Sequence, residues 1–322
     1  MSEERFLVNG AAGCIGAWVL QNLVREKVPV AAFDLDEKQK RLSLILVDNE
    51  IARIQFLHGD VSDYATVENA LKENRATRVI HLAAMQLPFC KVNPVAGARV
   101  NVVGTVNIFE AAKRLKLDNV VYASSTAVYG LSEEYPGKPL ANDALLKPHS
   151  HYGVCKQANE SNAAIYFQDD GISSIGLRPY VVYGAGGDLG MTSTPTKAIL
   201  AAAAGQPYRI SYGGRYCFQY ADDTAKAFIQ AARAGLSGAK VFNIGGKSIS
   251  TPNVIAAIEQ AEPSAQGRTS FDDVPLPFSP EVDNCALVEA IGPLVFTSLK
   301  EGVAETLAIF RRALANGKIK TD

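Results

Sequence analysis

The sequence predicts an α/β protein built on a doubly wound parallel sheet, and three observations support this. Short runs rich in β-branched and aromatic residues alternate with helical patterns as far as residue 178. Such alternation is typical of a parallel sheet covered by helices on both faces. A glycine-rich turn follows the first run, and the pattern changes after residue 180. That change predicts a smaller C-terminal lobe, with a substrate cleft between the two parts.

The elements are expected in a regular order along the chain. Strands are expected near residues 5–9, 28–33, 53–58, 78–82, 118–124 and 173–178. Helices are expected near residues 14–26, 62–75, 94–116, 150–169, 284–291 and 298–315. Right-handed crossovers then place the carboxyl ends of the strands along one edge of the sheet.

The first strand, residues 5–9, ends in a turn that suits a dinucleotide. Gly10, Gly13 and Gly16 precede or open a helical pattern that begins near Ile15. Residues without Cβ let the backbone approach a pyrophosphate, and the N–H groups at a helix start attract its charge. The spacing is one residue looser than the usual dinucleotide fingerprint.

The second strand is followed by Asp34. A carboxylate at that point can accept hydrogen bonds from both hydroxyls of an adenosine ribose and repels a 2′-phosphate, which favours NAD over NADP. Asp is also a preferred N-cap, so Asp34 could instead cap the next helix. Lys38 and Arg41 lie just beyond and could soften the exclusion of NADP.

The next strands also lead into candidate site segments. The third is followed by Gly59-Asp60-Val61, the fourth ends in His81-Leu82-Ala83-Ala84, and the fifth leads into Ser124-Ser125-Thr126. Because these strand ends share one edge with the glycine turn, we expect them to form one site. The two serines could equally end a strand and satisfy backbone groups.

The helix expected over 150–169 carries Tyr152 and Lys156. Their spacing of four residues places both side chains on one helix face. A positive charge nearby favours a phenolate over a phenol. A free tyrosine titrates near pH ~10, so a base that works near neutrality needs a shift of roughly 3 units. The lysine, a cationic cofactor ring and a desolvated pocket could together supply that shift.

Taken in order, these segments resemble the extended short-chain dehydrogenase/reductase family, which contains nucleotide-sugar epimerases and dehydratases. The resemblance also rests on the segment 178–184 and covers about residues 5–250. It implies an NAD-binding Rossmann domain over residues 1–178, to which parts of 215–245 return. It also implies a mostly substrate-binding, discontinuous lobe over residues 179–322.

The resemblance implies a role for individual residues. Tyr152 matches the catalytic base, Lys156 its partner, and Ser125 the hydroxyl that polarises the reacting oxygen. The residues implied to bind the cofactor are Gly10, Gly13, Cys14, Ile15, Gly16, Asp34, Asp60, Val61, Leu82, Ala83, Ala84, Asn101, Tyr152, Lys156, Tyr180 and Val181. The candidate substrate residues are Met85, Gln86, Thr126, His149, Thr192 and Arg215.

The residues after Ser125 limit which reactions of this family are expected. Dehydratases of the resembled family carry an Asp-Glu pair there, and decarboxylases carry a glutamate two positions on. Thr126 and Ala127 occupy these places. We therefore expect a sugar or nucleotide-sugar epimerase that works through a keto intermediate. The alternative is a net NAD-dependent dehydrogenase or reductase of an unphosphorylated sugar, sugar acid or other small hydroxy or keto compound.

Two further positions bear on the substrate. Val181 stands where many UDP-sugar epimerases have an asparagine that contacts the diphosphate, and Tyr216 stands where they often have an arginine. Arginine suits bidentate phosphate recognition. Arg209 or Arg215 could substitute, or the substrate could carry no phosphate. A third hypothesis is a cofactor-sensing interaction protein on the same fold, since fold does not fix function.

Composition limits the partners. The 322 residues carry a net charge of -1, which gives no reason to expect nucleic acid or an acidic membrane surface. No apolar run approaches the ~18 residues of a membrane helix, and the first strand leaves no room for a signal peptide, so a cytoplasmic protein is expected. The spacing of the five cysteines and four histidines predicts no metal site. A homodimer is implied through the helices near 94–116 and 150–169.

Overall fold

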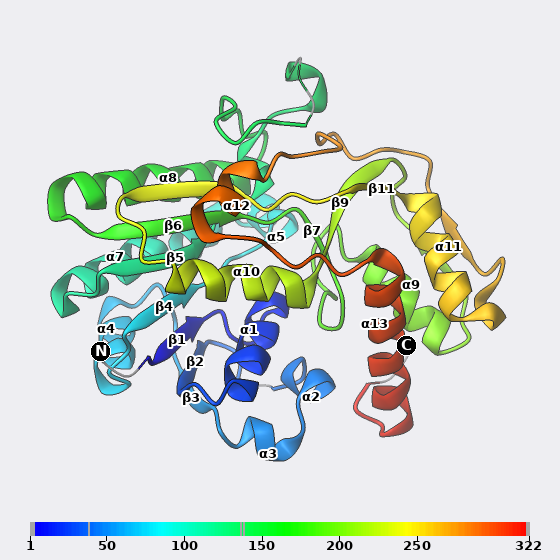
Figure 1. Cartoon of the computed structure of the whole chain (residues 1–322), viewed down its shortest axis with the longest axis horizontal. Helices are drawn as coiled ribbons and strands as arrows, with labels where there is room; N and C mark the ends of the chain where they lie inside the picture. Colours follow the sequence, from blue (N-terminus) through cyan, green and yellow to red (C-terminus); the bar gives the residue numbers. More distant parts are fainter. Residues whose placement is uncertain (1–3, 38, 136, 138, 320–322) are drawn as a thin grey trace.

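The central feature of the computed structural model, which describes residues 4–37, 39–135, 137 and 139–319, is a parallel seven-stranded sheet. Its strand order is β10-β6-β5-β4-β1-β2-β3 (Figure 1). The strands are β1 (Phe6–Asn9), β2 (Val30–Asp34), β3 (Gln55–His58), β4 (Arg78–His81), β5 (Asn119–Ala123), β6 (Ser173–Arg178) and β10 (Ala239–Asn243). The predicted doubly wound α/β class is confirmed. The edge strand β10 was not among the predicted strands.

Helices cover both faces of this sheet. On one face α1 (Cys14–Arg25) packs against α10 (Ala221–Arg233), and on the other α7 (Gly104–Leu115) packs against both α4 (Tyr64–Glu73) and α8 (His151–Asp170). The two-residue period of a strand divides the side chains between these faces. Phe6 and Val8 accordingly enter one apolar core, and Leu7 enters the other.

The second lobe contains two small sheets. One has the order β11-β9-β7, and the other pairs β12 with β8. These strands are β7 (Val181–Tyr183), β8 (Tyr208–Ile210), β9 (Arg215–Tyr220), β11 (Ser248–Ser250) and β12 (Thr269–Phe271). The helices on this side in Figure 1 are α9 (Thr194–Ala203), α11 (Thr251–Ala261) and α13 (Leu299–Ala315). Between β9 and β11 the chain returns to the main sheet through α10 and β10.

The remaining helices are short, and one prediction about them was wrong. They are α2 (Leu42–Ile45), α3 (Asp48–Ile51), α5 (Leu87–Val92), α6 (Pro94–Ala98) and α12 (Cys285–Ile291). The single helix expected over 94–116 is divided into α6, a π-helical turn at Arg99–Val103 and α7. The carbonyl of Asn101 accepts from the Thr105 hydroxyl at 2.7 Å and from Asn159 Nδ2 at 2.9 Å, which widens the helix there.

No helix in the described ranges combines the length and the apolar character that crossing a bilayer requires.

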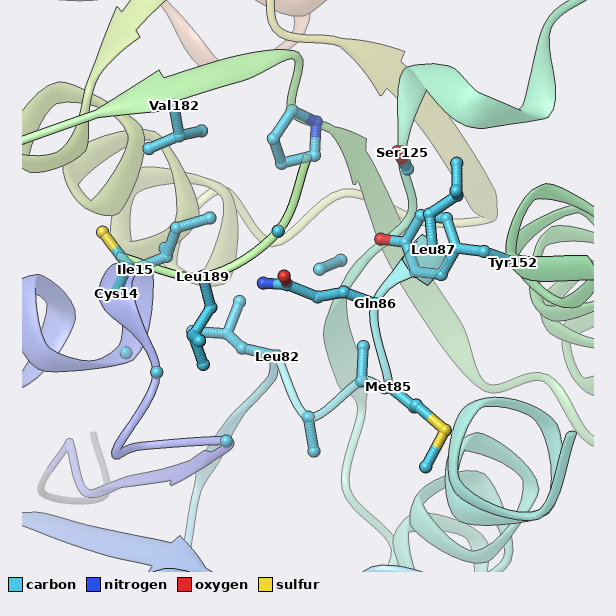
Figure 2. Close-up of a pocket in the computed structure, with 18 of the residues that line it drawn as sticks. Cys14, Ile15, Leu82, Met85, Gln86, Leu87, Ser125, Tyr152, Val182 and Leu189 are labelled. Carbon is cyan, nitrogen blue, oxygen red and sulfur yellow. The ribbon is translucent and has the colours of Figure 1, made fainter. Parts of the chain in front are cut away.

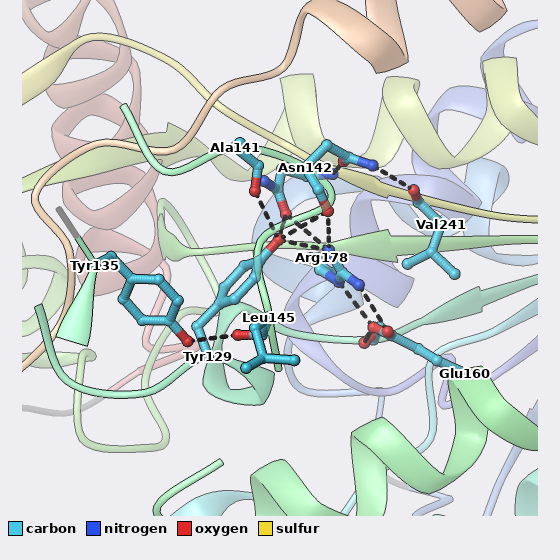
Figure 3. Close-up of polar contacts among 10 residues, drawn as sticks. Tyr129, Tyr135, Ala141, Asn142, Leu145, Glu160, Arg178 and Val241 are labelled. Atoms are coloured by element: carbon cyan, nitrogen blue, oxygen red, sulfur yellow. Dashed lines mark hydrogen bonds and ion pairs between the residues drawn. The ribbon is translucent and has the colours of Figure 1, made fainter. Parts of the chain in front are cut away.

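A buried ion pair joins α8 to the end of β6 (Figure 3). Arg178 donates from Nε and Nη2 to the two carboxylate oxygens of Glu160, at 2.8 and 2.7 Å. The Ser124 hydroxyl also donates to Glu160. On the other side, Arg178 Nη1 donates to the Tyr129 hydroxyl at 2.5 Å and to the Asn142 carbonyl at 2.9 Å. The Arg178 guanidinium and the Glu160 carboxylate are thus both hydrogen-bonded. A buried ion pair needs such hydrogen bonds to offset the cost of removing its charges from water.

We expect Arg178→Met to lower the free energy of unfolding by about 3–5 kcal/mol, because it leaves the Glu160 carboxylate buried without its partner. Urea denaturation measures the loss. The double variant Arg178→Met with Glu160→Met should recover part of it. The control Arg25→Met removes a solvent-exposed pair with Glu50 and should cost about 1 kcal/mol or less. Equal losses in the two single variants would contradict the structural importance of the buried pair.

Candidate active site

One cleft of about 510 Å³ runs along the carboxyl ends of the central strands. Figure 2 shows Cys14 and Ile15 at the start of α1 on one side and Ser125 with Tyr152 on the other, with Gln86 and Leu189 between them. Ligands of open α/β sheets bind at this edge. The half that contains the start of α1 is here called the cofactor half, and the half that contains Gln86, Thr192 and Phe278 is called the substrate half.

In the glycine turn, which borders the cofactor half, neighbouring backbone segments pack closely against Gly10 and Gly16. Gly10 has φ +78, and a Cβ there would overlap the backbone of Ala83. A Cβ at Gly16 would overlap the backbone of Gly10. No side chain caps α1, whose N-cap is Gly13, so its first N–H groups remain free. The turn therefore fits the pyrophosphate of a dinucleotide.

Asp34 lines the same half and organises the turn. Its Oδ2 accepts from the Ala12 amide at 2.8 Å and its Oδ1 from the Asp36 amide at 2.9 Å. The next helix, α2, has Arg41 as its N-cap, so Asp34 does not cap it. Each carboxylate oxygen keeps a lone pair for a ribose hydroxyl. The buried Nδ2 of Asn9, which also lines the cleft, has no hydrogen-bond partner and provides a further donor.

The loop 184–190 is fixed across the glycine turn. Trp18 Nε1 donates to the Ala185 carbonyl at 2.9 Å. Arg41 donates from Nε to Asp188 at 2.7 Å and from Nη1 to the Ala12 carbonyl at 2.8 Å. Gly186, Gly187, Leu189 and Gly190 of this loop line the cleft, so the loop borders the cofactor half. The Arg41 guanidinium is engaged by these contacts, and Lys38 lies outside the described residues.

The catalytic candidates come from the end of β5 and the start of α8. Ser150 caps α8 by accepting from the Gly153 amide at 3.0 Å. A Cβ at Gly153 would overlap the Ala127 carbonyl, so a glycine there lets α8 approach the segment after β5. Ser125 and Tyr152 both line the cleft, and Lys156 Nζ lies 5.6 Å from the Tyr152 ring centroid. These three side chains therefore converge at the middle of the cleft.

Burial shifts the pKa of Tyr152 and the pKa of Lys156 in opposite directions. Burial raises the pKa of Tyr152 to about 12, and the hydrogen bond from Ser125 offsets part of this rise. Burial lowers the pKa of Lys156 to about 8, so its ammonium stays protonated at neutral pH. That ammonium donates to the Ala123 carbonyl at 2.6 Å. The phenol of Tyr152 is neutral at pH 7 in this state, so ionisation requires a further positive charge beside it.

The structure brings most of the predicted site residues together. Those that line the cleft are Gly10, Gly13, Cys14, Ile15, Gly16, Asp34, Asp60, Val61, Leu82, Ala83, Ala84, Met85, Gln86, Ser125, Thr126, Tyr152, Lys156, Tyr180 and Thr192. The lining also contains residues to which sequence reasoning gave no site role, among them Asn9, Val182 and Phe278. No pattern in the sequence marked these three as site residues.

Two residues predicted to bind the cofactor are buried away from the cleft surface. Asn101 is fully buried, and its amide exchanges hydrogen bonds with the backbone of Met85 at 2.8 and 2.9 Å. It therefore positions the segment after β4. Val181 is also fully buried, in the apolar core of the second lobe.

Two predicted substrate residues also lie elsewhere. His149 is exposed, with Nε2 at 2.9 Å from Glu134 Oε2. Arg215 is exposed as well and donates from Nη2 to the Ser248 carbonyl at 2.7 Å. Neither is among the described residues that line the cleft.

Comparison with known proteins gives consistent results. The model of the NAD dependent epimerase/dehydratase family matches residues 6–245. The UDP-glucose 4-epimerase of Mycolicibacterium smegmatis is 29% identical over 95% of this chain and 98% of its own length. UDP-glucuronate 4-epimerase 4 of Arabidopsis thaliana is 30% identical over 75% of this chain and 60% of its own. The crystal structure of Thermus thermophilus UDP-glucose 4-epimerase with NAD superposes with a TM-score of 0.81, at 26% identity over 96% of this chain and 99% of that one.

We expect Asp188→Asn to speed NAD dissociation by about 2- to 5-fold. The substitution breaks the partly exposed ion pair with Arg41, which joins the loop 184–190 to the glycine turn across the cofactor half. Displacement of a fluorescent NAD analogue in stopped flow measures the rate. Asp170→Asn is the control, since it removes a comparable surface pair with Lys113 on α7 and α8. An unchanged rate in Asp188→Asn would show that the pair does not retain the cofactor.

Proposed function

This chain belongs to the NAD dependent epimerase/dehydratase family, and from that premise we propose that it is an epimerase of a sugar-like substrate. The enzyme is NAD-dependent, as are its relatives. The reaction inverts one hydroxyl-bearing carbon through a keto intermediate. The cofactor NAD, when bound, supplies the acceptor and donor of a hydride. The proposed division into an NAD-binding part, 1–178, and a mostly substrate-binding part, 179–322, belongs to the same interpretation.

The observation that carries the proposal is the convergence of Ser125, Tyr152 and Lys156 in one cleft beside the glycine turn. Tyr152 takes the proton of the reacting hydroxyl and returns it to the same oxygen after the keto intermediate has been reduced on its opposite face. Ser125 orients the reacting oxygen by a hydrogen bond. The Lys156 ammonium favours the ionised phenol through its charge, which the low-dielectric pocket strengthens.

The residues that follow Ser125 favour epimerisation over elimination. Thr126 and Ala127 line the cleft beside it, and neither can exchange a proton with carbon at a useful rate. Epimerisation needs only one base at one oxygen, which Tyr152 provides. Two named relatives, from Mycolicibacterium smegmatis and Thermus thermophilus, are UDP-glucose 4-epimerases, which supports the sugar-like substrate.

Net dehydrogenation of a small unphosphorylated substrate is the second candidate function. It is favoured by the positions of the cationic side chains. Among the described residues that line the cleft, only Arg41 and Lys156 are cationic. Arg41 belongs to the cofactor half and Lys156 to the catalytic group, which leaves the substrate half without one.

A cytoplasmic homodimer is part of the proposal. Val95 on α6, Val103 in the π-helical turn and Val154 on α8 are exposed, and these elements contact one another. A second copy would cover this apolar surface. Analytical ultracentrifugation tests the dimer, and a monomer at micromolar concentration would contradict it.

Tyr152→Phe should lower kcat by about 10²- to 10⁴-fold and leave NAD affinity within a factor of two, because it removes the base and keeps the ring. Steady-state kinetics and NAD titration measure the two effects. Tyr208→Phe, which lies outside the cleft lining, is the control. Undiminished turnover in Tyr152→Phe would show that another group acts as the base, whereas absence of turnover in the wild type would support the interaction-protein hypothesis.

The rate should rise with pH across roughly pH 6–8, because the acting base is the Tyr152 phenolate, whose phenol form has a pKa of about 12 without cofactor, and because Lys156 keeps its charge only up to its own pKa of about 8. A bound cationic ring lowers the pKa of Tyr152 and brings the rise toward neutrality. Lys156→Met removes one positive charge, so its rise should lie at higher pH than that of the wild type. A pH–rate profile for both proteins tests this, and coincident profiles would contradict the electrostatic role of Lys156.

The two candidate reactions differ in what they do to the cofactor pool. An epimerase should purify with NAD bound and produce no net NADH, because each turnover restores the cofactor. A dehydrogenase should accumulate NADH in proportion to substrate consumed. Absorbance of NADH during turnover, together with analysis of the cofactor released on denaturation, distinguishes them.

A further inference from the structure

The substrate half of the cleft is walled mainly by apolar side chains. Leu87, Phe89, Met191 and Phe278 all contribute to its lining. A diphosphate is recognised by arginine or lysine side chains that form charge-assisted hydrogen bonds. None of the described lining residues of this half is cationic.

The nearest alternatives for phosphate recognition are committed elsewhere. Arg209 donates from Nε to Asp272 at 2.6 Å, and Arg215 donates to a backbone carbonyl on β11. Neither lines the cleft. Helix α9 begins beside Ser193, but Pro195 removes one of its first N–H groups. The substrate half therefore offers little compensation for two phosphate charges.

A fixed segment forms the far wall of this half. Residues 274–280, here called the strap, contain three prolines, which limit backbone freedom. The Tyr180 hydroxyl donates to the Ser279 carbonyl at 2.6 Å, and the Leu276 amide donates to the Tyr216 hydroxyl at 2.5 Å. Phe278 of the strap lines the cleft and packs edge-on against Tyr180.

These contacts give Tyr216 a definite role. It is buried, and its hydroxyl holds the strap at the position where a phosphate-binding side chain was sought in the sequence. A long substrate that continued past Phe278 would have to displace the strap and break these hydrogen bonds. A short substrate meets no such obstacle.

Two uncommitted polar groups remain in the substrate half. The amide of Gln86 makes no hydrogen bond to any described residue, and Figure 2 shows it extending across the cleft between Leu189 and Tyr152. Its backbone is held in place because Asn101 binds the preceding residue, Met85, at both backbone groups. The Thr192 hydroxyl likewise has no partner among the described residues and lines the cleft.

We propose that the substrate is a short polyhydroxy compound without a nucleotide or phosphate group, bound through Gln86 and Thr192 and limited in length by the strap. This inference rests on the proposed function and specifies the substrate class of the same site. Gln86 would exchange hydrogen bonds with substrate hydroxyls through its carbonyl and its NH₂ group, and Thr192 would add one more partner.

The first test measures nucleotide binding to the wild-type protein loaded with NAD. Isothermal titration with UDP and with UDP-glucose should show no saturable binding up to about 5 mM. Titration of the cofactor-free protein with NAD shows that the preparation is competent. Saturable binding of either nucleotide with a Kd below about 1 mM would overturn the proposal.

The second test examines Gln86 with whichever unphosphorylated sugar, sugar alcohol or sugar acid the enzyme turns over. Gln86→Leu should raise KM about 10-fold and leave kcat within a factor of about two, the signature of lost uniform binding. Gln206→Leu, at an exposed position outside the cleft, is the matched control. An unchanged KM, or turnover of nucleotide sugars alone, would overturn the proposal.

Failure of this inference and failure of the proposed function give different results. Nucleotide binding would refute the substrate class and leave the effect of Tyr152→Phe on turnover intact. Full activity in Tyr152→Phe would refute the reaction and leave the nucleotide titration unchanged.

Discussion

The ion pair between Arg178 and Glu160 connects the segments on which the active site depends. Glu160 lies one helical turn beyond Lys156 on α8, and it also accepts from Ser124, the neighbour of Ser125. Arg178 ends β6 and reaches Tyr129, which follows β5. Because both charges are buried, the pair tolerates little misalignment. The ion pair, which lies outside the cleft, thereby fixes the relative positions of Tyr152, Lys156 and Ser125.

The parts of the site that could be predicted are those whose signal is local. The turn from Gly10 to Gly16 and the pair Tyr152 and Lys156 each lie within one short segment, so residue spacing alone fixes their geometry. The order of strand ends followed from right-handed crossovers. For the same reason the sequence places Asp34 and Ser125 at the edge where the structure has them.

The parts that could not be predicted depend on contacts between distant segments. Trp18 reaches Ala185 and Arg41 reaches Asp188, although about 150 residues or more separate the partners. Where the helix before Leu115 is divided, Thr105 and the distant Asn159 both donate to the Asn101 carbonyl. The strap is likewise held by the hydroxyl of Tyr180, between β6 and β7, and by the hydroxyl of Tyr216 on β9. Local propensity carries no information about such pairings.

The free N–H groups at the start of α1, together with the unpartnered Asn9 amide, have a consequence for the life of the protein in the cell. A dinucleotide would accept from these donors in the folded chain and not in the unfolded one, because the turn that brings them together exists only after folding. At a concentration 100 times its Kd, such a ligand adds about 2.7 kcal/mol to the folded state. Proteases that degrade transiently unfolded molecules would then remove the protein faster in cells depleted of dinucleotide, which makes its abundance follow the metabolic state.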